Sequence, residues 1–127
     1  MITIIRFETP DQVGLYGSGN CKGISDFSRH ITPSSDSLLW ETLADIADSD
    51  DEYDILDVLR EYRFGFASNE QVFAWMYRPE WLITLHKRGL IVSEYHCRLH
   101  DVVIGHTQAM FKNHVTRQTY LIPTYFV

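Results

Sequence analysis

The stretch RFGFASNEQVFAWM, residues 63–76, places a strand signal directly before a helix signal. Its first five residues (63–67) carry two phenylalanines, which predicts a short strand through the core. Ser68 and Gln71 then have the spacing of an N-terminal capping box, so we expect a helix to begin at Ser68. The face that this helix would bury comprises Val72, Phe73, Trp75 and Met76. The chain therefore mixes both kinds of secondary structure within one short segment.

Downstream of this stretch, the pattern predicts one more helix and then strands only. Pro79 suits the first turn of a helix, and Gly89 follows His86, Lys87 and Arg88 as a helix end. The predicted strands are Leu90–Cys97, Val102–Ile104, Gln108–Val115 and Thr119–Val127. Short breaks between them favour antiparallel hairpins, and Pro123 indicates that the last strand lies at an edge.

Upstream, the order of elements completes the prediction of the fold class. Met1–Glu8 predicts an N-terminal strand, and the glycine-rich segment Asp11–Ser35 predicts a long loop, of a kind that often carries function. Apolar stripes predict two helices, from about residue 36 or 37 to 47 and from 52 to 62. We therefore expect a single compact α+β domain over residues 1–127, with four short helices and a C-terminal antiparallel β-meander.

Composition and charge limit the classes of function that this chain can have. The chain has 127 residues, 45% of them hydrophobic, and a net charge of −6. No basic patch is visible in the sequence, which disfavours direct binding to nucleic acid. No apolar run approaches the ~18–20 residues that cross a bilayer. Together with an N-terminus unlike a signal peptide and with only two cysteines, these features predict a cytoplasmic protein with reduced thiols and no membrane contact.

The strongest local feature is a concentration of acidic residues on the two predicted helices. Between Glu41 and Glu61 the chain carries nine acidic residues and one basic residue, Arg60. We expect this surface to steer and pair with a partner protein that presents a basic surface. The residues predicted to bind this partner are Glu41, Asp45, Asp48, Asp50, Asp51, Glu52, Asp54 and Asp57.

Neither of the two metal-like patterns predicts a metal site. Asp48, Asp50 and Glu52 alternate as in a calcium loop, but the required glycine and glutamate positions hold Tyr53 and Leu59. The late histidines include His96 next to Cys97, which point to opposite faces of a strand. We therefore predict no bound metal and no bound cofactor.

Several segments, taken in order, carry a resemblance to a known group of proteins. These are IIRFE, GLY, RHITPSSD, RFGFASNEQVFAWM, GLIVSEYHC and IGHTQAMF. The central FGFAS-EQ-W pattern and the later G-x-x-Q-x-x-F pattern resemble small accessory proteins encoded by bacteriophages and prophages. The resemblance implies a phage protein that acts inside a bacterial host. The acidic segment around Asp48–Asp57 and the extension after Phe111 depart from it.

A weaker resemblance, to ADP-ribosyltransferase-like domains, concerns the order of a few residues. An opening strand with Arg6, the FAS segment with Ser68, and a late strand near Gln108 are similar to that arrangement. The resemblance implies that Arg6 would hold NAD, that Ser68 would support its nicotinamide, and that the glycine-rich segment 14–23 would converge on the same pocket. Gln108 stands where that family has its catalytic glutamate, which puts catalysis in doubt.

Two hypotheses of different classes follow. The first is an acidic phage-type accessory protein, more a binding protein than an enzyme, that binds and modulates a host or host-defence protein. The alternative is an ADP-ribosyltransferase-like domain that binds NAD, with or without catalysis. A homodimer paired through the C-terminal strand, residues 120–127, is a further possibility.

Overall fold

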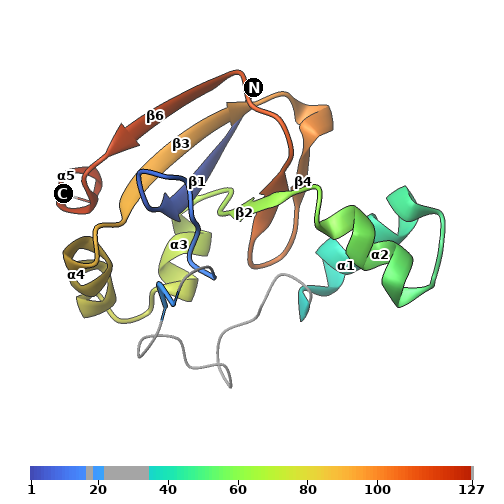
Figure 1. Cartoon of the computed structure of the whole chain (residues 1–127), viewed down its shortest axis with the longest axis horizontal. Helices are drawn as coiled ribbons and strands as arrows, with labels where there is room; N and C mark the ends of the chain where they lie inside the picture. The colour runs from blue at the N-terminus through green and yellow to red at the C-terminus, as the bar shows by residue number, and fades with distance from the viewer. Residues whose placement is uncertain (17–18, 22–34, 127) are drawn as a thin grey trace.

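The computed structural model describes residues 1–16, 19–21 and 35–126, and it confirms the α+β class. Figure 1 shows the elements in order along the chain. They are β1 (Ile2–Glu8), α1 (Ser37–Ala47), α2 (Glu52–Leu59), β2 (Arg63–Gly65), α3 (Asn69–Trp75), α4 (Glu80–Lys87), β3 (Ile91–Cys97), a short 3-10 helix (Leu99–Asp101), β4 (Val102–Ile104), β5 (Ala109–Phe111), β6 (Thr116–Tyr120) and α5 (Ile122–Tyr125).

The strands form two small antiparallel sheets. The first has the order β1-β3-β6, with Ile4 opposite Tyr95 and Tyr95 opposite Arg117. The second has the order β2-β5-β4. The strands of the C-terminal third are antiparallel as expected, but they divide between the two sheets instead of following one another in a single meander.

Side chains alternate between the two faces of β1, and these two faces lie in different surroundings. Ile5 and Phe7 point into a core that α3, α4 and α5 close with Val72, Trp75, Leu85, Ile122 and neighbouring side chains. Ile4 points to the other side, where it packs with Tyr95 and Phe111 between the two sheets. Arg6 and Glu8 share this second side, because residues two apart on a strand lie on one face. Two charged groups are thereby placed inside the molecule.

The predicted helix ends are confirmed where local chemistry sets them. The Ser68 hydroxyl accepts a hydrogen bond from the Gln71 N–H at 3.2 Å and begins α3. Gly89 follows α4 with φ of +86°, the left-handed conformation that glycine adopts without strain. Pro79 occupies the N-cap position of α4 without a capping hydrogen bond, one position before the first helical residue, Glu80.

Three predicted elements and one predicted core position differ from the structure. The strand expected over Thr119–Val127 is wrong: the strand ends at Tyr120, and Pro123 lies in the first turn of α5, where its missing N–H costs nothing. The strand expected over Gln108–Val115 shortens to β5, and the helix expected to reach Tyr62 ends at Leu59. Phe73 is exposed because only positions 72, 75 and 76 of α3 face the core.

Gly65 is expected not to tolerate alanine, because β2 and β1 approach closely at this point. A Cβ atom at Gly65 would lie 2.5 Å from Ile4 Cγ2 and 2.7 Å from the Ile5 carbonyl oxygen. Two backbone hydrogen bonds between Ile5 and Phe66, of 2.8 and 2.7 Å, hold that carbonyl in place. Gly65→Ala should lower the free energy of unfolding by about 1–3 kcal/mol in urea titration. An unchanged unfolding midpoint would contradict this close approach.

Candidate functional site

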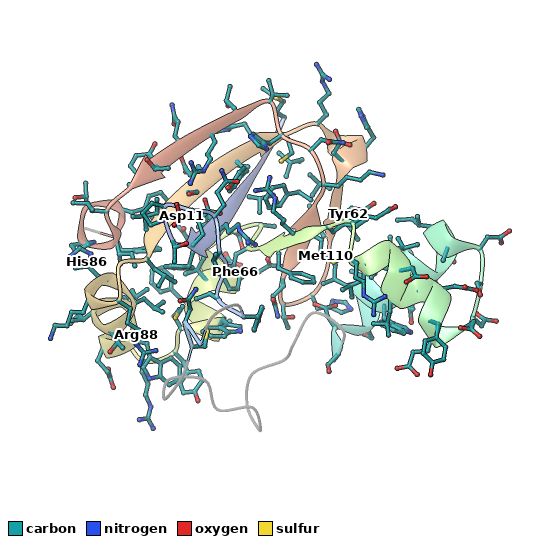
Figure 2. All side chains as sticks on the ribbon, viewed as in Figure 1. Asp11, Tyr62, Phe66, His86, Arg88 and Met110 are labelled. Carbon is teal, nitrogen blue, oxygen red and sulfur yellow. The ribbon has the colours of Figure 1, made fainter. Side chains whose placement is uncertain are left out.

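Helices α1 and α2 form a pair at one end of the molecule, which we call the acidic lobe (residues 37–59). Figure 1 shows this pair beyond the edge of β2 and β4, apart from α3, α4 and α5. Its apolar side packs around Leu39, Leu43 and Ile55, together with Val103 and Met110 of the second sheet. Figure 2 shows side-chain oxygens directed outward around the two helices, with Tyr62 close to the junction.

All eight acidic residues predicted to bind a partner are exposed on this lobe. Asp51 caps α2 by accepting from the Tyr53 and Asp54 N–H groups, and Asp57 pairs with Arg60 at 2.8 Å. Asp54 accepts a hydrogen bond from Ser49, and Asp48 ends α1 in the left-handed conformation. Five of the eight, Glu41, Asp45, Asp48, Asp50 and Glu52, make no side-chain hydrogen bond or ion pair with any residue that the structure describes, and all of these but Asp48 are also free of a capping role.

Two apolar side chains lie exposed among these carboxylates. Tyr53 is 79% exposed and Ile46 is 49% exposed. The lobe therefore presents apolar contact area within a field of negative charge.

The lobe is connected to the rest of the molecule, which we call the body, through Asp36. This buried carboxylate caps α1 by accepting from the Leu39 N–H at 3.2 Å. Its second oxygen accepts from the Thr107 N–H at 2.8 Å and from the Thr107 hydroxyl at 2.7 Å. Burial would raise the pKa of Asp36, but the hydrogen bonds from Thr107, Leu39 and His106 hold it below its usual value.

Of the residues predicted for the alternative site, Arg6, Gly14 and Gln108 meet at one cavity. Its volume is about 120 Å³, and its other lining residues are Phe7, Leu15, Tyr16, Phe64, Gly65 and Phe66. Arg6 is 9% exposed and Gln108 is 1% exposed, so both are built into the wall. Tyr16 donates its hydroxyl proton to Gln108 Oε1 at 3.1 Å. Phe66, labelled in Figure 2, lies near the middle of the body.

The remaining residues of that prediction do not join the cavity. Ser68 is not part of its lining, because its hydroxyl caps α3. Of the predicted glycine-rich segment 14–23, residues 17–18 and 22–23 lie outside the described residues, as do residues 24–34 of the longer predicted loop. Glu94 of β3, an acidic residue that also lies outside the cavity lining, accepts hydrogen bonds from Tyr120 and Tyr125 on the helix-covered face of the first sheet.

A charged network that the sequence analysis did not find lies beside the cavity, around Glu8. The Glu8 carboxylate is 0% exposed and accepts from Arg6 Nε at 2.9 Å. Ser93 Oγ and Arg117 Nη2 donate to its other oxygen at 2.6 and 2.7 Å. The Tyr95 hydroxyl lies 2.7 and 2.8 Å from the two oxygens. Four side chains from three strands thus satisfy one buried carboxylate.

The pKa of Glu8 follows from this environment. Burial alone would raise the pKa, because a low dielectric disfavours the charged form. Hydrogen bonds from Ser93, Tyr95 and Arg117 favour the ionised form and hold the pKa below its usual value. Arg6 adds its charge in the same direction. Glu8 is therefore an anion in the folded protein at neutral pH.

Arg6 and Arg117 pair with this one carboxylate and Arg63 lies nearby without touching it, which leaves a local excess of positive charge. Arg63 stacks on the Tyr95 ring with Cζ 4.7 Å from its centroid, and Arg117 Cζ lies 5.7 Å from the same centroid. The charges of Arg6, Arg63 and Arg117 against that of Glu8 give a local sum of +2 within an acidic protein. One signal in the sequence could have indicated part of this arrangement: Arg6 and Glu8 stand two apart on a predicted strand.

The expectations on metal ligands, membrane spans and cysteines can be compared with the described residues. Among residues 1–16, 19–21 and 35–126, no group of three or more His, Cys, Asp or Glu side chains is close enough to hold a metal ion. Within the same described ranges, no helix has the length and apolar character to cross a membrane. Cys21 and Cys97 are both buried free thiols, as expected for a chain without a disulfide.

The described parts define a mixed α+β protein with an acidic helical lobe and a small aromatic cavity beside a buried ion network. The family model described as "Bacteriophage T4 Y00F protein" matches residues 1–124, so the chain belongs to this bacteriophage protein family. This match confirms the resemblance to phage-encoded proteins over nearly the whole chain. Searches of the curated proteins and of the solved structures found no significant match.

Proposed function

We propose that this phage protein is an accessory protein of the infected cell that binds and modulates a host or host-defence protein through its acidic lobe. The proposed partner presents a basic surface, and the encounter takes place in the bacterial cytoplasm. The observation that carries the proposal is the exposure of all eight predicted carboxylates on one helix pair, which also exposes Tyr53 and Ile46.

The lobe has two properties that a binding surface requires. Its carboxylates draw a basic partner by long-range attraction, which salt weakens. Its aromatic and aliphatic side chains, Tyr53 and Ile46, supply the apolar contact that exposed ion pairs alone do not. The four carboxylates without structural roles allow this surface to be changed without disturbing a cap or an ion pair.

The triple variant Glu41→Lys, Asp45→Lys and Asp50→Lys is expected to lose its partner while remaining folded. Each change adds two charges, so the net charge rises from −6 to 0. Binding should weaken roughly tenfold or more, because attraction at the rim becomes repulsion. The measurement is affinity capture from lysate of the bacterial host at low and high salt, with mass spectrometry and circular dichroism of each protein.

The matched control reverses three exposed acidic residues of the body: Asp11, Glu70 and Glu80. It makes the same change in net charge, but away from the lobe. A partner that the control variant captures and the lobe variant does not would support the proposal. Equal capture by both variants, or equal loss from both, would contradict it.

The alternative, an ADP-ribosyltransferase-like domain that binds NAD, has one observation in its favour: Arg6, Gly14 and Gln108 line one cavity. Its volume, about 120 Å³, lies below the roughly 300–1,000 Å³ of sites that bury drug-sized ligands. A whole dinucleotide is larger than this space, so the geometry favours the acidic lobe as the functional surface.

A homodimer is a further proposal, but its pairing strand cannot be the expected segment, residues 120–127. Residues 122–125 are helical and cannot pair as a strand, whereas β6 is an edge strand of the first sheet. A dimer through the C-terminal strand would therefore use Thr116–Tyr120.

A further inference from the structure

The cavity lined by Arg6 and Gln108 combines aromatic walls with a buried cationic group. Tyr16 and Phe64 meet edge to face, with ring centroids 6.3 Å apart, and Phe7 and Phe66 do so at 6.2 Å. All four of these rings contribute to the lining. A bare inorganic ion would lose its hydration against such walls without regaining it, so the walls favour a ligand with its own apolar surface.

Arg6 has donors left over for a ligand. A guanidinium carries five N–H groups. Arg6 uses one toward Glu8, one toward the Phe64 carbonyl at 2.6 Å and one toward the Gln12 carbonyl at 3.4 Å. No other acceptor among the described residues takes the remaining two. A side chain that is 9% exposed thus retains unused donors while lining a cavity.

The charge nearby determines what kind of acceptor fits. Arg63 has as hydrogen-bond partners Gln12, Tyr95 and His114, none of which is acidic. Its positive charge and that of Arg117 therefore add to that of Arg6, with Glu8 as the one anion in the network. An anionic oxygen is favoured there over a neutral one, and a planar carboxylate matches the fork of N–H groups on a guanidinium.

The volume sets the size of the ligand. An apolar cavity of roughly 150 Å³ holds one benzene molecule. This cavity, of about 120 Å³, is somewhat smaller but partly open to solvent, so a ligand is limited to a single ring. We propose that it binds a small aromatic carboxylate, with the single ring between the aromatic walls and the carboxylate at Arg6. Such a site is independent of the acidic lobe, because no residue of the lobe lines the cavity.

The test is a titration of the full chain with benzoate, followed by two-dimensional ¹H–¹⁵N NMR. Benzoate is expected to shift the backbone amides of Gly14 and Gly65 and the side-chain amide of Gln108, which all lie at the cavity wall. Benzamide has the same ring without the charge, and acetate has the charge without the ring. Both should bind at least roughly tenfold more weakly, since each lacks one of the two interactions.

A pair of variants separates the cationic network from general charge effects. Arg63→Gln removes one positive charge beside Arg6 but changes no residue of the cavity lining. It should weaken benzoate binding roughly three- to tenfold, as expected for a nearby partly buried charge. Arg60→Gln removes the same charge from an exposed position that directly follows the acidic lobe and should leave binding unchanged.

Three outcomes would overturn the proposal: no shift of the three cavity amides by benzoate, equal binding of benzamide, or equal effects of the two arginine variants. Shifts confined to residues away from the cavity would count as the first of these. If Arg63→Gln proves unstable, Tyr16→Phe provides a second variant. It removes the hydroxyl that holds Gln108 and should change the benzoate-induced shift of the Gln108 side-chain amide.

Discussion

The variant Glu8→Gln is expected to lose about 3–5 kcal/mol of its free energy of unfolding, as when one partner of a buried ion pair is removed. Glutamine has nearly the same shape, but its NH₂ group would replace either Oε1, which accepts from Arg6, or Oε2, which accepts from Ser93 and Arg117. Two arginine charges would remain partly or wholly buried with no anion between them. A domain that is stable by about 5–15 kcal/mol would lose a large share of its stability.

The measurement is urea unfolding followed by circular dichroism at pH 7, with Glu61→Gln as the control. Glu61 is exposed and makes no side-chain contact of this kind with the described residues, so its variant should differ from the wild type by less than about 0.5 kcal/mol. If Glu8→Gln does not fold, Ser93→Ala removes one donor and keeps the ion pairs. It should cost about 1–2 kcal/mol.

The pH dependence of the free energy of unfolding tests the role of Glu8 in a second, independent way. Because the folded pKa of Glu8 is lowered, its contribution is fully present above the ordinary pKa of about 4.3 and is lost as the pH falls below that value. The difference in stability between wild type and Glu8→Gln should therefore shrink between about pH 5 and pH 3. A difference that stays constant over this range, or one below about 1 kcal/mol at pH 7, would contradict the role given to Glu8.

The sequence predicted those elements whose ends are set by nearby residues. Ser68 with Gln71 and Gly89 each mark a helix boundary within one turn, so their effects are visible without tertiary structure. Pro123 was misread because proline suits both a strand edge and the first turn of a helix. Packing favours the helix α5 over a strand, because Ile122 is buried and Phe126 stacks on Phe7 with ring centroids 5.9 Å apart.

The acidic lobe, the Glu8 network and the cavity also differ in how far the sequence alone predicts them. The acidic lobe is local in sequence, and its exposure follows from the apolar stripes of two adjacent helices. The Glu8 network joins residues 6, 8, 93, 95 and 117, and only a fold can bring these together. The cavity shows both cases, because Arg6 and Gln108 were predicted to converge, whereas Tyr16 and Phe64 were not singled out.

The second large effect is expected at Asp36, where alanine should lower the free energy of unfolding by about 3–4 kcal/mol. The loss of the α1 cap accounts for about 1–2 kcal/mol of this. The rest comes from the Thr107 N–H and hydroxyl, which lose their acceptor in a partly buried place. Because the Asp36 pKa is lowered, this stability is present above its ordinary value of about 3.9 and is lost as the pH falls below it.

Asp36→Asn separates the two functions of this side chain. Asparagine caps helices as well as aspartate does, so the bond to the Leu39 N–H can persist. Its amide nitrogen, however, cannot accept from Thr107, so the two hydrogen bonds from Thr107 that tie the acidic lobe to the body are lost, while the His106 N–H keeps its acceptor. Hydrogen exchange should then increase over residues 37–59 while the strands β1 and β3 stay protected. An exchange pattern equal to that of the wild type, or loss of protection in both regions at once, would contradict Asp36 as the link that holds the lobe in place.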